Sequence, residues 1–427
     1  MSIQASEKAK NLLSKSIDCI VLLTYALLLV IQMHRYFYEN SFNIYIFRSS
    51  FICYAVLILI CAFKIFYHLR KYPLYSLLSS NILLLSLWLC YYKVNYSSHD
   101  LLSHWPALIT TLLLIVSMMQ IPTDYIVKTF FVTIGFLYTI RIFMATFLDI
   151  PSVITCIQTG EGLSLGFGNH NFPMVLLFFL VLSWIYISRN RKNRLIDAII
   201  ILFITAILAL LTRSKTSTLL LVITVIVIVI QSLINCEVLE KFNNFKKTLK
   251  KFGSVYALLS PLILVFISIG GAIIFNIYIT RHPDAINGIN NVTFLSRFST
   301  LSYDFAYNHI WLPFQHIEVP PYELYTHFPF SPITGGGIYM DYSDNVCHYL
   351  ICYYGFIAFS LIVALYLLTT YNAFKCKDES LLIILGLIAT FSIMERSSLL
   401  YYANPFLVIS LSVIFHNTMS NNQKNLL

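Results

Sequence analysis

The residues best suited to chemistry in this sequence are cations that interrupt or end apolar segments. Arg213 and Lys215 lie in one short turn, Arg297 lies in a polar segment, and Arg396 lies in a second short turn. Arg141 lies inside an apolar run, where an arginine costs about 2.5–3.5 kcal/mol to insert into a bilayer. A guanidinium donates two parallel hydrogen bonds to phosphate and stays charged at a membrane surface. These cations predict a site that binds a phosphate-bearing anion.

A second set of side chains could move protons. Asp344 and His348 are four residues apart, so on a helix they would share one face, with Asn345 beside them. A carboxylate or imidazole near a substrate hydroxyl can act as a general base. An Asp before a long apolar helix is also an ordinary N-cap, and a His there can simply bind the backbone. Both interpretations stay open for this pair.

Three further polar residues are candidates for substrate contact. His170 and Asn171 precede an apolar run, where they either line a cavity or cap the helix, and Glu395 precedes Arg396. The nine cysteines form no C-x-x-C pair and lie mostly within or beside apolar runs. We therefore expect neither a metal nor another cofactor.

Composition indicates the class of protein that must position these residues. Hydrophobic residues make up 58% of the chain and charged residues 11%, and the mean hydropathy is +0.76. A globular protein carries about twice that share of charge. The basic residues that give the net charge of +9 lie in short loops between apolar runs. The orientation of the chain in the membrane explains them there, so no nucleic-acid partner is implied. The sequence predicts an all-α polytopic membrane protein.

The apolar runs approach the ~20 residues that a helix needs to cross a bilayer. They predict twelve spans, of which two are unusually short. We expect the spans at about 17–33, 46–63, 74–92, 104–119, 125–147, 172–188, 195–211, 217–235, 254–279, 344–369, 381–394 and 398–415.

The basic residues predict the orientation of this bundle. With the N-terminus inside, 18 of the 28 Lys and Arg, Lys64 among them, fall in inner loops, and the stretch 148–171 lies on the outer face. Removing span 104–119 would turn the two most basic loops outward. Both termini are then cytoplasmic, and residues 1–427 form one membrane domain. Residues 280–343 become one large extracytoplasmic loop between spans nine and ten. Arg213, Arg297 and Arg396 lie on the outer face, where basic residues are disfavoured.

Four segments, in this order and spacing, resemble the bacterial O-antigen and capsular polysaccharide polymerase family (Wzy-type), which is related to the O-antigen ligases. The segments are Gly166–Asn171, Leu211–Thr216, Ser296–Arg297 and Asp344–Leu350 running to Gly355, with a weaker echo at Glu395 and Asn404. The resemblance covers roughly residues 160–410. Ligases have a His at the position of Asp344, whereas polymerases commonly have an acidic residue followed by Asn, so the match favours a polymerase.

The resemblance implies a metal-independent glycosyl transfer at the outer face of the bacterial cytoplasmic membrane. A growing glycan would move from its polyprenyl-pyrophosphate carrier to the sugar of an incoming lipid-linked repeat unit. Asp344 and His348 would be the catalytic candidates. The expected substrate contacts are Arg213, Arg297, Lys215, Arg141, His170, Asn171, Asn345, Glu395 and Arg396. Further expected partners are membrane lipid, a chain-length regulator and a flippase.

Three other functions stay open. A ligase would transfer the finished glycan to a lipid acceptor. A lipid-linked oligosaccharide flippase would also have about twelve spans, but it would have short loops throughout and two similar halves. The large loop is single, and no convincing repeat relates residues 1–210 to 211–427. The last alternative is a non-catalytic subunit of a polysaccharide assembly complex.

Overall fold

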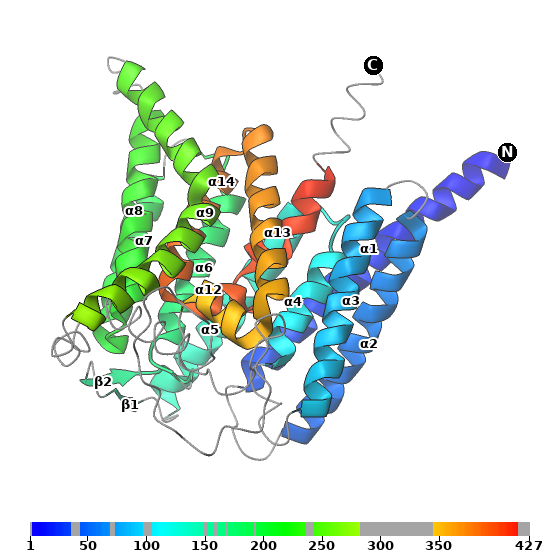
Figure 1. Ribbon diagram of the computed structural model, residues 1–427, viewed down its shortest axis with the longest axis horizontal. Helices are drawn as coiled ribbons and strands as arrows, with labels where there is room; N and C mark the ends of the chain where they lie inside the picture. The colour runs from blue at the N-terminus through cyan, green and yellow to red at the C-terminus, as the bar shows by residue number, and fades with distance from the viewer. Residues whose placement is uncertain are drawn as a thin grey trace. The chain divides into compact units, whose positions relative to one another are not determined.

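The computed structural model of the chain is helical throughout the residues it describes, apart from one two-stranded hairpin (Figure 1). The described residues are 2–35, 43–68, 73–96, 105–148, 153–156, 160–167, 169–191, 194–235, 243–281 and 345–416. The all-α prediction is therefore confirmed in its main part. The large loop expected at 280–343 lies outside these residues, except for its first two positions.

The chain divides into two compact units. Unit 1 contains residues 1–86, 108–242 and 401–427, and unit 2 contains residues 87–107 and 243–400. The elements of unit 1 are α1 (Ser2–Arg35), α2 (Asn43–His68), most of α3 (Pro73–Tyr96), most of α4 (Trp105–Ser117), α5 (Thr123–Phe147), β1 (Val153–Cys156), β2 (Gly160–Leu163), α6 (Phe172–Ile187), α7 (Leu195–Thr212), α8 (Lys215–Asn235) and α15 (Pro405–Val408).

Six helices among the described residues are long and apolar enough to cross a bilayer, which indicates a membrane protein. They are Leu13–Met33, Thr123–Phe147, Leu195–Thr212, Lys215–Leu233, Lys251–Ile274 and Gly355–Lys375. Five shorter apolar helices accompany them, at Ile52–Tyr67, Tyr75–Leu87, Leu108–Ser117, Phe172–Ile187 and Glu379–Met394. The number of crossings therefore remains a prediction.

Two of the short helices, α4 and α6, differ from the long ones in burial. Residues 108–118 of α4 and its following turn are buried on every side, and α6 is buried along nearly its whole length. The long helices α5 and α7 instead alternate buried and exposed positions, with exposed Phe136, Phe203 and Leu210. A helix that is apolar all round belongs in the interior of a bundle, so these short helices are its core.

Unit 1 has polar contacts at two ends. At one end, which we call the network end, Lys64 and Asp18 meet the turn after α4, and Arg189 after α6 pairs with Asp124 of α5. At the other, the hairpin end, β2 packs against the last turn of α7. Asp18 and Met33 of α1 belong to opposite ends, and their separation of 15 positions corresponds to about 22 Å of helix.

The β-hairpin was not expected from the sequence. β1 and β2 pair antiparallel, with Val153 opposite Leu163 and Cys156 opposite Gly160, at the lower edge of Figure 1. The β-branched run Val153–Ile154–Thr155 favours a strand locally. The hairpin occupies part of the stretch 148–171, which the sequence had suggested only as an outer loop.

Unit 2 contains α9 (Asn243–Arg281), α12 (Val346–Tyr349), η4 (Leu350–Tyr354), α13 (Gly355–Lys375), α14 (Glu379–Met394) and η5 (Arg396–Leu399). In this unit α9 packs along α14 and α13. Buried Leu264, Cys347 and Ala389 form a core cluster that joins α9, α12 and α14.

The tenth expected span, 344–369, is divided in the structure. Residues 346–354 form one α-helical turn and a π-helical turn, and Gly355 then adopts φ +81 and ψ 174. This backbone conformation is open to glycine and breaks the helix. The long apolar helix begins only at Gly355 and ends at Lys375. The long helix therefore begins eleven residues after the expected start of this span at 344.

The twelfth expected span, 398–415, is also broken. Residues 396–399 form a 3-10 turn, and α15 begins at Pro405, which occupies its first turn behind the N-cap Asn404. After Ile409 the chain continues as helix over 410–416. Proline fits the first turn of a helix but not its interior, so the helix cannot include the residues that precede Pro405.

Candidate functional site

Arg141 of α5 is held inside unit 1 by contacts with two other segments. Its Nη1 donates a hydrogen bond of 3.0 Å to the carbonyl oxygen of Met33 on α1. Its guanidinium carbon lies 4.8 Å from the centre of the Phe167 ring. The side chain is fully buried. A buried guanidinium gains from both a carbonyl acceptor and an aromatic face, so Arg141 fixes the segment after the hairpin onto α5.

The backbone of that segment approaches Arg141 closely at Gly166. Gly166 has φ +79, and a Cβ atom added there would lie 3.5 Å from Cγ of Arg141. A glycine is required because other residues rarely adopt this conformation. Gly166 and Phe167 thus form a cradle for Arg141. The sequence had singled out the segment, but it did not indicate that Phe167 is the partner of Arg141.

Arg213 lies in a tight turn between α7 and α8. Its φ of +54 places it in the left-handed region, and its N–H donates to the carbonyl of Ala209, as in a helix C-cap. The side chains of Arg213 and Lys215 are both exposed, whereas Thr212 and Ser214 are buried. The cationic side chains of Arg213 and Lys215 are therefore accessible, while the buried Thr212 and Ser214 hold the backbone of the turn in place.

The hairpin braces this turn. A Cβ atom on Gly162 of β2 would lie 2.5 Å from the carbonyl oxygen of Thr212 and 3.4 Å from Cβ of His170. β2, His170 and the end of α7 are therefore in close contact around Gly162. His170 is largely buried, and burial lowers the pKa of its imidazole. The structure thus brings two expected site segments together at the hairpin end.

Hydroxyl groups lie beside the cations of the same turn. The side-chain oxygens of Ser214 and Ser217 are buried, and among the described residues they have no hydrogen-bond partner. Thr212 donates its hydroxyl to the carbonyl of Leu208 within α7. Asn171 precedes α6 without capping it through its side chain, and its N–H donates to Oδ1 of Asn169. Asn171 is half-buried and lies next to His170.

In unit 2 the candidate Asn345 is held by three hydrogen bonds. Its Nδ2 donates to Oγ of Ser268 on α9 at 2.8 Å and to the carbonyl of Ile393 on α14 at 3.0 Å. Its Oδ1 accepts the N–H of His348 at 3.1 Å, so Asn345 is the N-cap of α12. Both amide donors are occupied by the protein itself, which indicates a positioning role for this side chain.

The two expected catalytic residues have different outcomes. His348 lies in α12 and is fully buried, in the same unit as Asn345. Asp344 lies just outside the described residues. The N-cap that the sequence suggested for Asp344 belongs instead to Asn345, one position later. The expected position of Asp344 on one helical face with His348 stays a prediction.

The last two candidates follow α14. Glu395 is buried and ends that helix in an extended conformation, and its carbonyl accepts the hydroxyl of Ser398. Arg396 begins the 3-10 turn η5. Arg297 lies outside the described residues, so its position relative to either unit stays a prediction.

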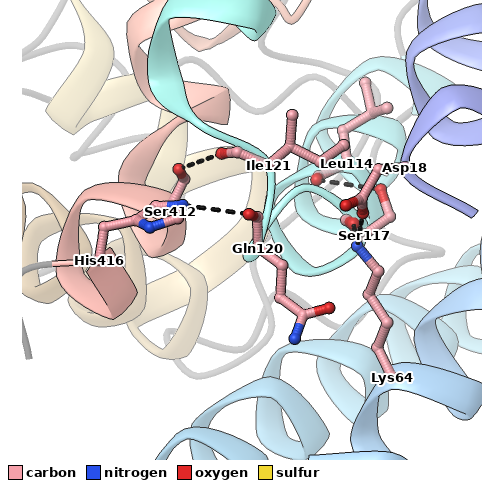
Figure 2. A network of polar contacts seen from close by, with 8 residues as sticks. All are labelled: Asp18, Lys64, Leu114, Ser117, Gln120, Ile121, Ser412 and His416. Carbon is pink, nitrogen blue, oxygen red and sulfur yellow. Dashed lines mark hydrogen bonds and ion pairs between the residues drawn. The ribbon is translucent and has the colours of Figure 1, made fainter. Parts of the chain in front are cut away.

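The network end holds a polar cluster that the sequence did not indicate (Figure 2). Nζ of Lys64 lies 3.1 Å from Oδ1 of Asp18 and donates to the carbonyl of Ser117 at 2.6 Å. The ring of His416 bonds the carbonyl of Gln120 at 3.1 Å. In the same turn, Ser412 donates its hydroxyl to the carbonyl of Ile121. Lys64 had been counted in an inner loop, but it lies buried within α2.

No group of three or more His, Cys, Asp or Glu side chains that could hold a metal ion occurs in the described part of the chain. Comparison with protein-family models, with curated proteins and with solved structures found no match to this chain. The function must therefore be argued from the residues and their arrangement.

Proposed function

We propose that this chain is a glycan polymerase that joins polyprenyl-pyrophosphate-linked repeat units at the outer face of a bacterial cytoplasmic membrane. The observation that carries the proposal is the turn at Arg213 and Lys215. Arg213, whose backbone is left-handed, and Lys215 are both exposed there, and Gly162, which also adjoins His170, packs against the carbonyl of the preceding Thr212. The resemblance of four sequence segments to the Wzy-type family supports the same assignment.

The proposed reaction requires stabilisation of negative charge on a leaving group. A hydroxyl of the acceptor sugar attacks the anomeric carbon of the donor, and the bond from that carbon to the pyrophosphate oxygen breaks. The carrier pyrophosphate leaves with the bonding electrons. Arg213, assisted by Lys215 and by Arg297 from the large loop, would bind its oxygens. A fixed cation at this point lowers the barrier because it stabilises charge that develops in the transition state.

The other expected residues fit supporting roles. Arg141 would hold the 166–171 segment, and with it His170 and Asn171, beside the substrate. Asp344 is the proposed general base, since it precedes a helix whose start Asn345 fixes. The burial of His348 favours a role in shaping that helix start over direct proton transfer. Glu395 and Arg396 are proposed to contact the acceptor, and a flippase and a chain-length regulator are proposed as partners.

A ligase remains the closest alternative, because it would need the same cations for the same leaving group. The test uses strains in which the chromosomal copy is replaced by Arg213→Ala, Arg213→Lys or the control Lys375→Ala. Lys375 is also an exposed cation, but it ends α13 in unit 2. Surface glycans are separated by length, and the carrier-linked pool and the amount of tagged protein in membranes are measured.

We expect Arg213→Ala to leave only single repeat units while the protein still inserts, and Lys375→Ala to leave long chains unchanged. Arg213→Lys should retain part of the activity because it keeps the charge but loses the planar fork. Long glycan that stays on the carrier would instead identify a ligase. Repeat units trapped at the inner face would identify a flippase, and normal chain lengths in Arg213→Ala would refute the proposed role.

A further inference from the structure

In the turn between α6 and α7, at the network end of unit 1, the described cationic side chains outnumber the described carboxylates that they contact. Arg189 is fully paired: Nη1 and Nη2 donate to the two carboxylate oxygens of Asp124 at 2.6 and 3.1 Å. Among the described residues, Arg191 and Arg194 share a single acidic neighbour, Asp197, whose Oδ1 lies 3.7 Å from Nη1 of Arg191. Two guanidinium groups therefore share one carboxylate.

Arg194 has an incomplete set of hydrogen bonds although it is 5% exposed. Its Nη2 donates to the carbonyl of Ser188 at 2.9 Å, and its backbone N–H donates to Oγ of Ser232 at 3.1 Å. Its Nη1 has no acceptor anywhere in the described part of the chain. A buried cationic donor without an acceptor is costly, so this position favours an added anionic oxygen.

Burial lowers the pKa of the Arg194 guanidinium, Asp197 acts in the opposite direction, and Arg191 lowers it again. The two arginines therefore act on each other through space as like charges. An anion between them would relieve this repulsion. Arg191 is the accessible member of the pair, with a side chain that is 57% exposed and a guanidinium 5.0 Å from the centre of the Trp184 ring.

The surroundings of the turn fit a lipid better than a free ion. The half-buried Trp184 lies in the last turn of α6, at the kind of position where amphipathic rings meet lipid headgroups. From this turn α7 extends with Ile196, Ile199 and Phe203 on its exposed face. This apolar strip is continuous with the basic turn along one helix. A molecule with an anionic head and acyl chains matches both parts.

We propose that Arg191 and Arg194 bind the phosphate of an anionic phospholipid, whose acyl chains lie along the exposed face of α7. This site lies at the opposite end of unit 1 from Arg213, so it is independent of the proposed polymerase site. It assigns to the α6–α7 turn the recognition of a lipid headgroup. The positive-inside tendency alone would need neither a buried Arg194 nor an unfilled donor.

The full chain in neutral detergent would be titrated with phosphatidylglycerol, with phosphatidylcholine and with inorganic phosphate. Bound lipid would be counted by native mass spectrometry and the unfolding temperature followed. The variants are Arg194→Gln, Arg191→Gln and the charge-matched control Lys375→Gln. We expect the wild type and Lys375→Gln to retain phosphatidylglycerol selectively. Arg194→Gln should weaken its binding by about tenfold or more, as expected for loss of a charge-assisted contact.

Arg191→Gln removes an exposed side chain, so it tests the same site if Arg194→Gln does not fold. Equal retention of phosphatidylcholine and phosphatidylglycerol would overturn the proposal. So would unchanged phosphatidylglycerol binding in the Arg191→Gln variant. Stabilisation by inorganic phosphate to the same extent as by the lipid would show a plain phosphate site and refute the lipid assignment.

Discussion

A Cβ atom at Gly162 would lie 2.5 Å from the carbonyl oxygen of Thr212, so β2 and the end of α7 meet without space for any side chain. This contact joins the hairpin to the turn that carries Arg213. The carbonyl belongs to the backbone of the last residue of α7, so no side-chain rotation can remove it. The hairpin can therefore occupy this position only because residue 162 is a glycine, which has no Cβ atom.

We expect Gly162→Ala to displace the hairpin from α7 and to destabilise the protein by about 1–3 kcal/mol, the usual cost of overpacking. Glycan length should fall with it, because the brace behind Arg213 is lost. Thermal unfolding in detergent and glycan gels measure the two effects. Gly253→Ala is the control, since a Cβ there has no heavy atom within 4 Å. Equal unfolding temperatures for both variants would show that the contact can relax.

The contact between Arg141 and Phe167 predicts an energetic coupling. Arg141→Lys and Phe167→Leu should each destabilise unit 1, and the double variant should cost less than the two single changes added together. A cation over an aromatic ring away from water contributes about 0.5–2 kcal/mol, which sets the expected coupling. Unfolding free energies of the four proteins complete the cycle. If the losses of unfolding free energy are additive, the Phe167 ring stabilises the protein by packing alone and has no cation–π interaction with Arg141.

The three hydrogen bonds of Asn345 predict that its replacement lowers the stability of the protein, and that any loss of activity follows from this loss of stability. Asn345→Ala should cost about 3 kcal/mol, since two buried acceptors and one backbone donor lose their partner. Asn372→Ala is the matched control, because Asn372 is a half-buried amide whose solvent-exposed hydrogen bond goes to the carbonyl of Leu368 in its own helix. If Asn345→Ala unfolds at the normal temperature but makes no long glycan, Asn345 contacts substrate instead.

The ion pair between Lys64 and Asp18 predicts that replacing one partner destabilises the protein more than replacing the other. Asp18→Asn should destabilise the protein by about 3 kcal/mol, because it leaves the buried ammonium of Lys64 without a carboxylate. Lys64→Met should cost less, since the Asp18 side chain is 24% exposed and partly hydrated. The double change to Asp18→Leu and Lys64→Met should recover part of the loss. Chemical unfolding in detergent ranks the three variants, and a larger loss for Lys64→Met than for Asp18→Asn would contradict this account.

The sequence predicted most helices where long apolar runs end at polar residues. The expected spans 172–188 and 195–211 match α6 and α7 within one residue, because charged Arg189 and Arg194 and the polar turn at 212–215 mark their ends. Hydropathy failed at Gly355 and Pro405. Both lie inside apolar runs, and the breaks there come from backbone conformation and not from polarity.

The candidate site could be predicted as a set of residues but not as a set of contacts. Spacing identified the segments that hold Arg141, His170 and Arg213. It could not show that a hairpin joins two of them. A glycine indicates that another backbone segment approaches closely, but it does not identify that segment. Lys64 was misplaced for a similar reason. Counting cations by loop does not detect the carboxylate of Asp18, which is distant in the sequence.

The burial of residues 108–117 of α4 means that two kinds of position in one bundle should tolerate different substitutions. Leu114 on α4 is 0% exposed, whereas Leu210 on α7 is 80% exposed. Acyl chains are fluid and adapt to whichever hydrocarbon side chain they meet, so homologous chains should interchange Leu, Ile and Phe freely at position 210. Position 114 must conserve size as well as polarity.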